Sequence, residues 1–178
     1  MKKLLIVFTL LFSLKLIAQS PAKIGDTVFV NKFGTISIHK MGSPIKSFDY
    51  EKGFSFVIIS NYARYGYDLM NNFKIVTNHN DTGWVMIKSL ERSFEDGLCF
   101  TPSKYNELKN KYSNIFYKLM NGEYWIGMKE DELMIAIGKP TKINTTITAN
   151  KISKQLVYGE SDANYFYTEN GILTAVQQ

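Results

Sequence analysis

The hydrophobic period of this chain changes near Leu90, and that change divides the chain into two parts of different secondary structure. Before Leu90, apolar residues mostly alternate with polar ones, the pattern of half-buried β-strands. The stretch "DTVFVNKF", for example, places Val28 and Val30 on one face. After Leu90, apolar residues recur every three or four positions, the period of an α-helix, before strand patterns return near the end. We therefore expect an α+β fold.

Two further segments of the first part predict strands. "FSFVIIS" (54–60) is a continuous β-branched and aromatic run, typical of a strand covered on both faces. Residues 73–90 predict a hairpin, because a polar turn separates two apolar runs. The sequence Gly83-Trp84-Val85, followed by a short turn to Leu90, resembles the closing strand of bacterial SH3-like domains. That resemblance implies an N-terminal all-β SH3-like barrel over residues 20–90.

Residues 101–122 predict one amphipathic helix. Thr101 is the expected N-cap, Pro102 suits the first helical position, and Asn121-Gly122 is a stop signal. The apolar positions form one stripe: Tyr105, Leu108, Tyr112, Ile115, Phe116 and Leu119. A stripe of this kind normally faces a core, and the alternative is a surface that recruits a partner or a membrane.

A second, shorter helix is predicted within "YWIGMKEDELMIAIGKP" (124–140). Three acids at 130–132 suit the positive end of a helix dipole, and Gly138 followed by Pro140 ends the helix. Lys129 stands at the capping position and its ammonium cannot accept a backbone N–H, so we expect a helix start with unsatisfied donors. About nine residues are marginal as an isolated helix, so this helix must pack on another element.

Three apolar runs follow and predict the surface on which it packs: "KQLVYG", "NYFYTEN" and "ILTAVQQ". Asn170-Gly171 joins the last two runs and is the strongest short hairpin signal. We expect a three-stranded antiparallel sheet with two helices on one face.

This order of elements resembles the small outer-membrane-assembly lipoprotein family (SmpA/OmlA, BamE-like). The matching features are Gly127-Met128, the acidic turn, Gly138-Lys139-Pro140, "QLVYG" and "YFYTENGILTAVQ". The resemblance implies that residues 91–178 form a small domain of two helices packed on a three-stranded antiparallel sheet. Where the family usually has Thr or Ser after Gly-Met, this chain has Lys129.

The first nineteen residues have the layout of a secretory signal peptide. Two lysines precede the apolar run Leu4–Leu14, and Ala18 with Ser20 offers a cleavage point. We expect an exported protein, periplasmic or secreted; the alternative is an uncleaved membrane anchor. No later apolar run is long enough for a stable membrane span. Without the segment's three lysines, 18 basic residues face 16 acidic ones, and no basic stripe predicts a nucleic-acid partner.

The sequence offers no catalytic or metal-binding constellation. His39 and His79 have no Cys, His or acid at ligand spacing, so we expect neither a metal nor a cofactor. Cys99 is expected to be a buried small hydrophobe rather than a reactive thiol. The acidic turn at 130–132 has two interpretations: dipole complementation on a solvated turn, which we favour, or a carboxylate cluster for acid–base chemistry.

The candidate binding residues are Tyr62, Arg64, Tyr65 and Tyr67, in the tyrosine-rich stretch 61–69. In a barrel, such a loop would line a groove for an extended peptide or a cell-wall fragment; alternatively it only packs over the barrel end. We expect a non-catalytic cell-envelope protein, not an enzyme, that binds or scaffolds an envelope protein or a peptidoglycan peptide. The alternatives are a cell-wall enzyme with an SH3-like targeting part, and an inhibitor that docks through its sheet. The oligomeric state stays open.

Overall fold

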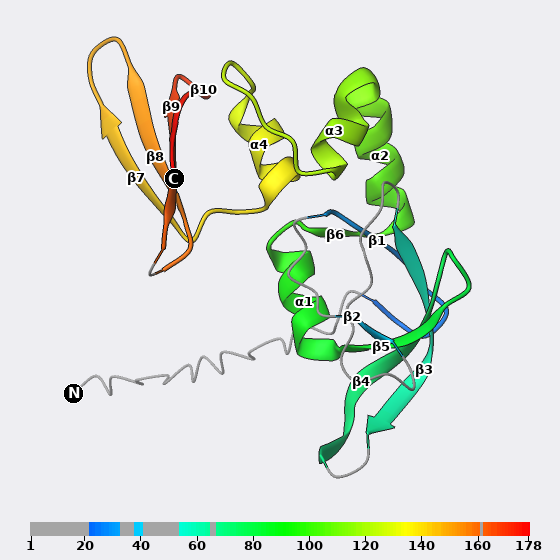
Figure 1. Cartoon of the computed structure of the whole chain (residues 1–178). Helices are drawn as coiled ribbons and strands as arrows, with labels where there is room; N and C mark the ends of the chain where they lie inside the picture. The colour runs from blue at the N-terminus through cyan, green and yellow to red at the C-terminus, as the bar shows by residue number, and fades with distance from the viewer. Residues whose placement is uncertain (1–21, 33–37, 41–53, 65–66, 161) are drawn as a thin grey trace, which may run out of the picture.

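The computed structural model describes residues 22–32, 38–40, 54–64, 67–160 and 162–178 (Figure 1). Within them the chain has an α+β fold with two antiparallel sheets. The first sheet contains β1 (Thr27–Val30), β2 (Ile38–Lys40), β3 (Ser55–Arg64), β4 (Tyr67–Thr77), β5 (Thr82–Met86) and β6 (Cys99–Phe100). The other elements are α1 (Ile87–Glu95), α2 (Pro102–Tyr112), the 3₁₀ turn η1 (Ser113–Ile115), α3 (Phe116–Met120), α4 (Glu130–Ile137), β7 (Lys142–Ile147), β8 (Ile152–Tyr158), β9 (Asn164–Glu169) and β10 (Ile172–Gln177). The predicted signal segment 1–19 lies outside the described residues.

The first sheet has the strand order β2-β5-β4-β3-β1-β6 and curls around its own core (Figure 1). The predicted hairpin is confirmed, with Phe73 opposite Val85. The all-β expectation for residues 20–90 needs a correction, because the chain turns into helix α1 at Ile87. Ile87, Leu90 and Phe94 are spaced three and four apart and pack on the sheet's core, which favours a helix over a turn. Leu90, the predicted end of the first part, lies inside α1. Strand β6 follows α1 and pairs with β1 of the first sheet.

The predicted helix over 101–122 is present in two pieces. Thr101 is its N-cap as expected, and its hydroxyl accepts the Lys104 N–H at 3.3 Å. The helix is interrupted at Ser113, whose φ of 35° is not helical, and it resumes as α3. Tyr112 and Phe116, on either side of the interruption, both lie in the core that α2 and α3 share with the second sheet.

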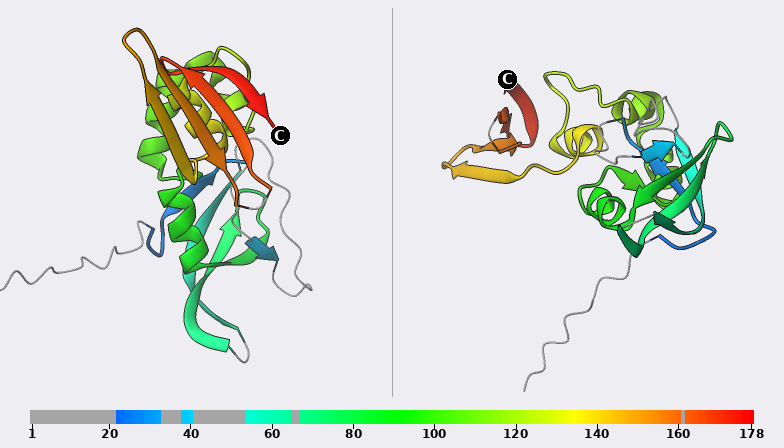
Figure 2. Two further views of the ribbon diagram at one scale, coloured as in Figure 1. Left: turned by 90° about the vertical axis from the view of Figure 1, so that its left-hand side faces the viewer. Right: turned by 60° about the horizontal axis from the view of Figure 1, so that its bottom comes forward.

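The second sheet has four strands in the order β10-β9-β8-β7, not the three that were predicted. The additional strand, β7, pairs with β8 along all six of its residues. Its six residues are all exposed, so its sequence lacks the alternation that marks a half-buried strand. The Asn170-Gly171 hairpin is confirmed, with φ of 48° and 79° as a type I′ turn requires. The helices lie behind one face of this sheet (Figure 2).

Helix α4 is attached to the hairpin of β9 and β10 through its first turn. The N–H of Gly127 donates to the Leu173 carbonyl at 2.8 Å, and the N–H of Glu130 donates to the Gly171 carbonyl at 2.8 Å. The Glu132 carboxylate accepts the Lys129 N–H at 2.9 Å. The expectation of an unsatisfied helix start is therefore wrong for the N–H groups of Lys129 and Glu130, although the Lys129 side chain makes no capping bond, as predicted.

Two carboxylates of the acidic turn join α4 to other elements. Glu130, with a side chain only 14% exposed, pairs with Lys154 of β8 at 2.7 Å and accepts the buried Thr168 hydroxyl at 3.1 Å. Asp131 accepts the Tyr112 hydroxyl at 2.7 Å, which ties α4 to α2. The interpretation of a solvated turn is thus incorrect for Glu130. These carboxylates hold the helix in place.

The Asp131 contact predicts a pH dependence of stability. Burial alone would raise the pKa of the Asp131 carboxyl. Hydrogen bonds from Tyr112 and Lys111 outweigh this effect, so the pKa lies below its ordinary value of 3.8. A lowered pKa contributes stability that is fully present above the ordinary value and is lost as pH falls through the folded-state value. We expect Asp131→Asn to lower the free energy of unfolding by about 0.5 kcal/mol at pH 6, because the pair is half exposed. Urea titrations at pH 6 and pH 2 check this, and an equal difference at both pH values would contradict it.

Candidate functional site

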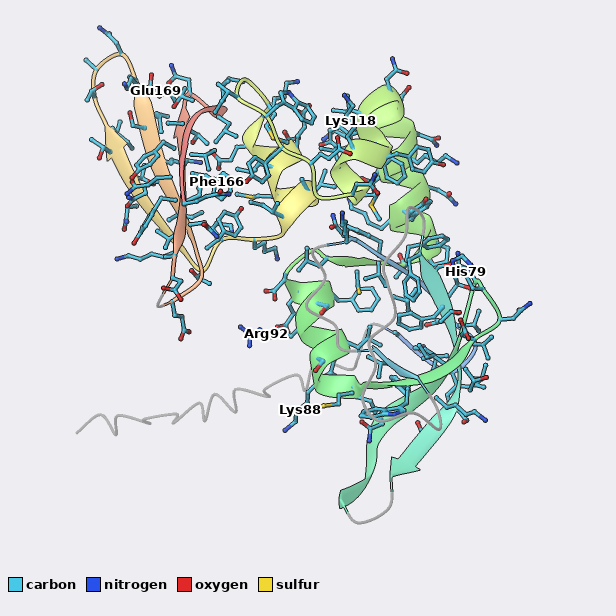
Figure 3. All side chains as sticks on the ribbon, viewed as in Figure 1. His79, Lys88, Arg92, Lys118, Phe166 and Glu169 are labelled. Atoms are coloured by element: carbon cyan, nitrogen blue, oxygen red, sulfur yellow. The ribbon has the colours of Figure 1, made fainter. Side chains whose placement is uncertain are left out.

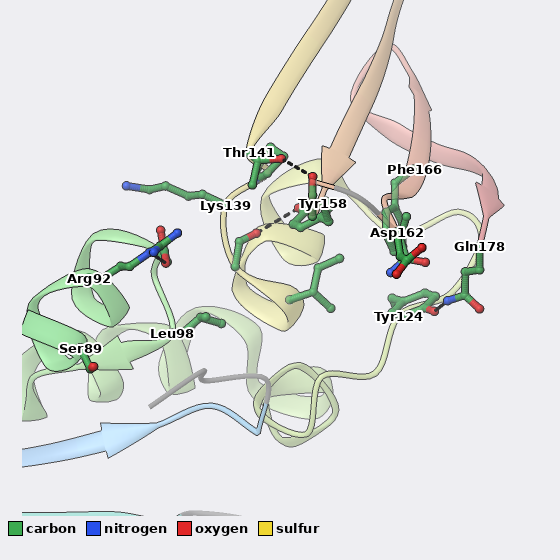
Figure 4. A pocket seen from close by; sticks show the side chains of 16 residues that line it. Ser89, Arg92, Leu98, Tyr124, Lys139, Thr141, Tyr158, Asp162, Phe166 and Gln178 are labelled. Atoms are coloured by element: carbon green, nitrogen blue, oxygen red, sulfur yellow. Dashed lines mark hydrogen bonds and ion pairs between the residues drawn. The ribbon is translucent and has the colours of Figure 1, made fainter. Parts of the chain in front are cut away.

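A cleft of about 670 Å³ lies between the two sheets (Figure 4). One wall comes from α1 and the segment that follows it, from Ser89 to Leu98. The opposite wall comes from the ends of β8 and β9, and the connection 137–141 forms the part between them. Five separate regions of the sequence thus meet here, including Tyr124 and the C-terminal Gln178. Pockets that enclose small ligands often form where two packed units meet.

The cleft has an aromatic floor. Phe166 packs edge-to-face against Tyr124 at 5.1 Å and against Tyr158 at 5.2 Å between ring centroids. Phe166 itself is buried and extends from β9 (Figure 3). The Tyr158 hydroxyl donates to the Gly138 carbonyl at 3.0 Å. Burial, assisted by the charge of Glu130, raises the pKa of Tyr158, so the hydroxyl stays a neutral donor.

The rim of the cleft carries opposite charges at its two ends. Arg92 lies 3.7 Å from Asp96 and is 79% exposed, and the Lys139 side chain is on the same side (Figure 4). Asp162 and Gln178 lie at the other end, where the Gln178 amide donates to Tyr124 at 2.6 Å. Asp96 offsets one of the two cations, so a ligand along the cleft would meet a net positive charge at this end and the Asp162 carboxylate at the other.

Buried hydrogen bonds fix the two walls relative to each other. The Asn31 side chain follows β1 and donates to the carbonyls of Leu119 at 3.1 Å and Ile135 at 2.6 Å. At the cleft itself, the Lys139 N–H donates to the Asp96 carbonyl at 2.9 Å. This bond holds the connection 137–141 against the segment that follows α1.

The tyrosine-rich stretch lies away from this cleft. Tyr62 and Arg64 are in β3 and Tyr67 is in β4, where Arg64 is opposite Tyr67 near the tip of a long hairpin (Figure 1). Tyr65 lies outside the described residues. The predicted loop is therefore mainly strand. Arg92 and Tyr158 line the cleft but were not predicted as site residues. Neither belongs to a sequence motif that indicates a binding site.

The remaining candidates for chemistry have structural surroundings. Cys99 is 3% exposed in the first core, and burial raises the pKa of its thiol. His79 lies in the turn between β4 and β5, and His39 is in β2. In the described ranges, no three His, Cys, Asp or Glu side chains gather closely enough to hold a metal ion. No helix of the described chain has the length and apolar character needed to cross a membrane.

Comparisons of this chain with protein-family models, with curated proteins and with solved structures give no match. The functional assignment therefore depends on the geometry and chemistry of the cleft. No histidine or cysteine is among the described residues that line it. Its chemistry is that of aromatic faces, amide and hydroxyl groups, and separated charges, which suits binding.

Proposed function

We propose that this protein is an exported, non-catalytic cell-envelope protein that binds an extended peptide in the cleft between its two sheets. The peptide belongs to an envelope protein or to peptidoglycan. The observation that carries the proposal is the cleft itself, with its aromatic floor and a rim whose two ends differ in net charge. The N-terminal signal pattern supports export.

The size and polarity of the cleft favour a short peptide. A volume of about 670 Å³ is within the range of pockets that enclose a small organic molecule, roughly 300–1,000 Å³. In the orientation that matches the charges, a carboxylate of the peptide lies near Arg92 and Lys139, and an ammonium lies near Asp162. An apolar side chain then covers Phe166 and Tyr158.

The alternative is a cell-wall enzyme whose SH3-like part targets it. Such an enzyme needs a nucleophile or a bound water next to a base. The carboxylates that line the cleft are Asp96, which lies 3.7 Å from Arg92, and Asp162 at the other end. Incubation of the purified protein with peptidoglycan separates the two proposals. We expect no released fragments, and reproducible release abolished by one substitution would establish the enzyme.

The binding proposal predicts a specific effect of Arg92→Glu. Reversal of this charge places a carboxylate where the ligand's own carboxylate lies, so capture of envelope proteins or muropeptides should fall about tenfold. Lys88→Glu is the matched control, because Lys88 is exposed on the same helix but does not line the cleft (Figure 3). Quantitative pull-downs from envelope extract measure both variants. Equal loss in both, or loss in neither, would exclude the cleft as the binding site.

A further inference from the structure

Strand β7 forms an edge of the second sheet with its other side open. It pairs with β8, and in the described parts of the chain no further strand pairs with it. All six of its residues are exposed, and it lies at the outer margin of the molecule (Figures 1 and 2). Exposed edges are usually protected by charges, prolines or bulges. Here the sequence Lys-Ile-Asn-Thr-Thr-Ile has one charge, at its first position, and its register with β8 is regular.

The register of the sheet determines which backbone groups face outward. Just after β7, the N–H of Thr148 donates to the Lys151 carbonyl at 2.9 Å. In an antiparallel ladder, the N–H and C=O of one residue point to the same neighbouring strand, and the direction alternates along the chain. The even-numbered residues of β7 therefore bond β8, and the odd-numbered ones, Ile143, Thr145 and Ile147, direct their backbone groups to the open edge.

The two faces of β7 differ in polarity. Ile143 and Ile147, 45% and 73% exposed, are on the face that buries Leu156 of β8 against the helices. They extend this apolar face beyond the part that the helices cover. On the opposite face, the Asn144 amide donates to Gln155 at 2.8 Å. An occupant of the edge must thus be apolar on one face and polar on the other.

We propose that the occupant is a second copy of this chain, paired through β7 in antiparallel orientation about a two-fold axis at Thr145. In this register Ile143 lies opposite the second copy's Ile147, and Thr145 lies opposite its own equivalent. Asn144 lies opposite the second copy's Thr146 on the polar face. The outward N–H and C=O groups of three residues in each copy pair with one another, and the two sheets become one of eight strands.

Charge and face polarity favour this occupant and this register. The two copies of Lys142 lie three residues from the axis on opposite sides, roughly 20 Å apart, which exceeds the screening length of about 8 Å at physiological salt. A shift of one residue would place Ile143 against the polar face. Strand β7 is therefore complementary to a second copy of itself. A different extended peptide would also need apolar side chains on one face and polar side chains on the other.

The mass of the protein in solution tests the proposal. We expect protein purified from cells that express the full chain to be a dimer by light scattering at micromolar concentrations. Thr145→Pro removes an N–H that faces the open edge and leaves the bonds to β8 intact, so it should give a monomer with an unchanged circular dichroism spectrum. Ile147→Lys should do the same by adding a charge to the interface. A monomeric wild-type chain, or a dimer that survives both changes, would overturn the proposal.

Cross-linking tests the register. In Thr145→Cys the two introduced thiols lie across the axis with Cα atoms about 5.5 Å apart, within the range for a disulfide. Diamide should therefore convert this variant to a covalent dimer at least tenfold faster than Thr148→Cys, whose thiols lie roughly 20 Å apart. The native Cys99 is buried and serves as an internal background. Similar rates for the two variants would exclude the register.

Discussion

Replacement of Asn31 by alanine is expected to lower the free energy of unfolding by about 3 kcal/mol. Asn31 is fully buried, and its amide nitrogen donates to the carbonyls of Leu119 and Ile135. Both carbonyls lie near the C-terminal ends of helices, α3 and α4, where the last four carbonyls lack partners within the helix. One side chain from the first sheet thus caps two helices of the second part.

The size of the effect follows mainly from the Ile135 carbonyl, which alanine would leave without this donor, while the Leu119 carbonyl keeps the Gly122 N–H at 2.9 Å. An unsatisfied buried polar group costs about 1–3 kcal/mol, and alanine also leaves a small cavity. For a chain of this length, 3 kcal/mol corresponds to a fall in melting temperature of about 6–12 °C. Asn31→Asp should be more harmful, because it sets a carboxylate against the same carbonyls.

Urea denaturation followed by tryptophan fluorescence measures this change. Asn110→Ala is the control, because Asn110 is exposed on α2, and its loss should alter stability by less than about 0.5 kcal/mol. If Asn31→Ala and Asn110→Ala unfold at the same urea concentration, Asn31 does not fix the two parts of the chain to each other. An unfolding curve that separates into two transitions would indicate that Asn31 couples two otherwise independent units.

Features that depend on local chemistry could be predicted from the sequence. The turn at Asn170-Gly171 requires two residues that tolerate positive φ, and these two residues alone indicate it. The cap at Thr101 and the stop at Gly138 are equally local. In each case the chemistry that forms the structure lies within a few adjacent residues, so a single sequence contains the whole signal.

The missed elements lack such a local signal. Helix α1 begins at Ile87, directly after strand β5, and its N-cap Met86 makes no side-chain capping bond, so no local signal marks its start. Strand β7 is exposed on both faces, and exposure removes the hydrophobic period on which the prediction depends. The interruption at Ser113 preserves the four-residue spacing of Tyr112 and Phe116, which also fits a continuous helix.

The candidate site was not predictable for a different reason. The cleft joins α1 to the ends of β8 and β9, and the pairing of Glu130 with Lys154 joins α4 to β8. These contacts form only when the sheet and the helices pack together. The spacing of residues along the sequence therefore does not predict them. The tyrosines of the stretch 61–69 are close together in the sequence, so they form a visible pattern. The residues of the aromatic floor are far apart in the sequence and form no such pattern.

The second large effect is expected at Gly138, which ends α4 and lines the cleft. Its φ of 85° and ψ of −173° belong to a region that only glycine adopts easily. A Cβ atom there would lie 3.1 Å from the Asp96 carbonyl and 3.1 Å from the Leu98 side chain. Gly138→Ala should therefore lower the free energy of unfolding by about 3 kcal/mol or more, from backbone strain and from contact with two groups that cannot easily move.

Gly127→Ala separates these two causes. Gly127 also has a positive φ, 93°, but an added Cβ would meet no atom within 4 Å. It should thus cost only the backbone strain, about 1–2 kcal/mol. Thermal unfolding of both variants measures the difference, and equal melting temperatures would show that the segment around Gly138 does not pack closely on Asp96 and Leu98. Because Gly138, Asp96 and Leu98 all line the cleft, Gly138→Ala should also weaken ligand capture at temperatures where the variant is still folded, while Gly127→Ala should bind as the native chain does.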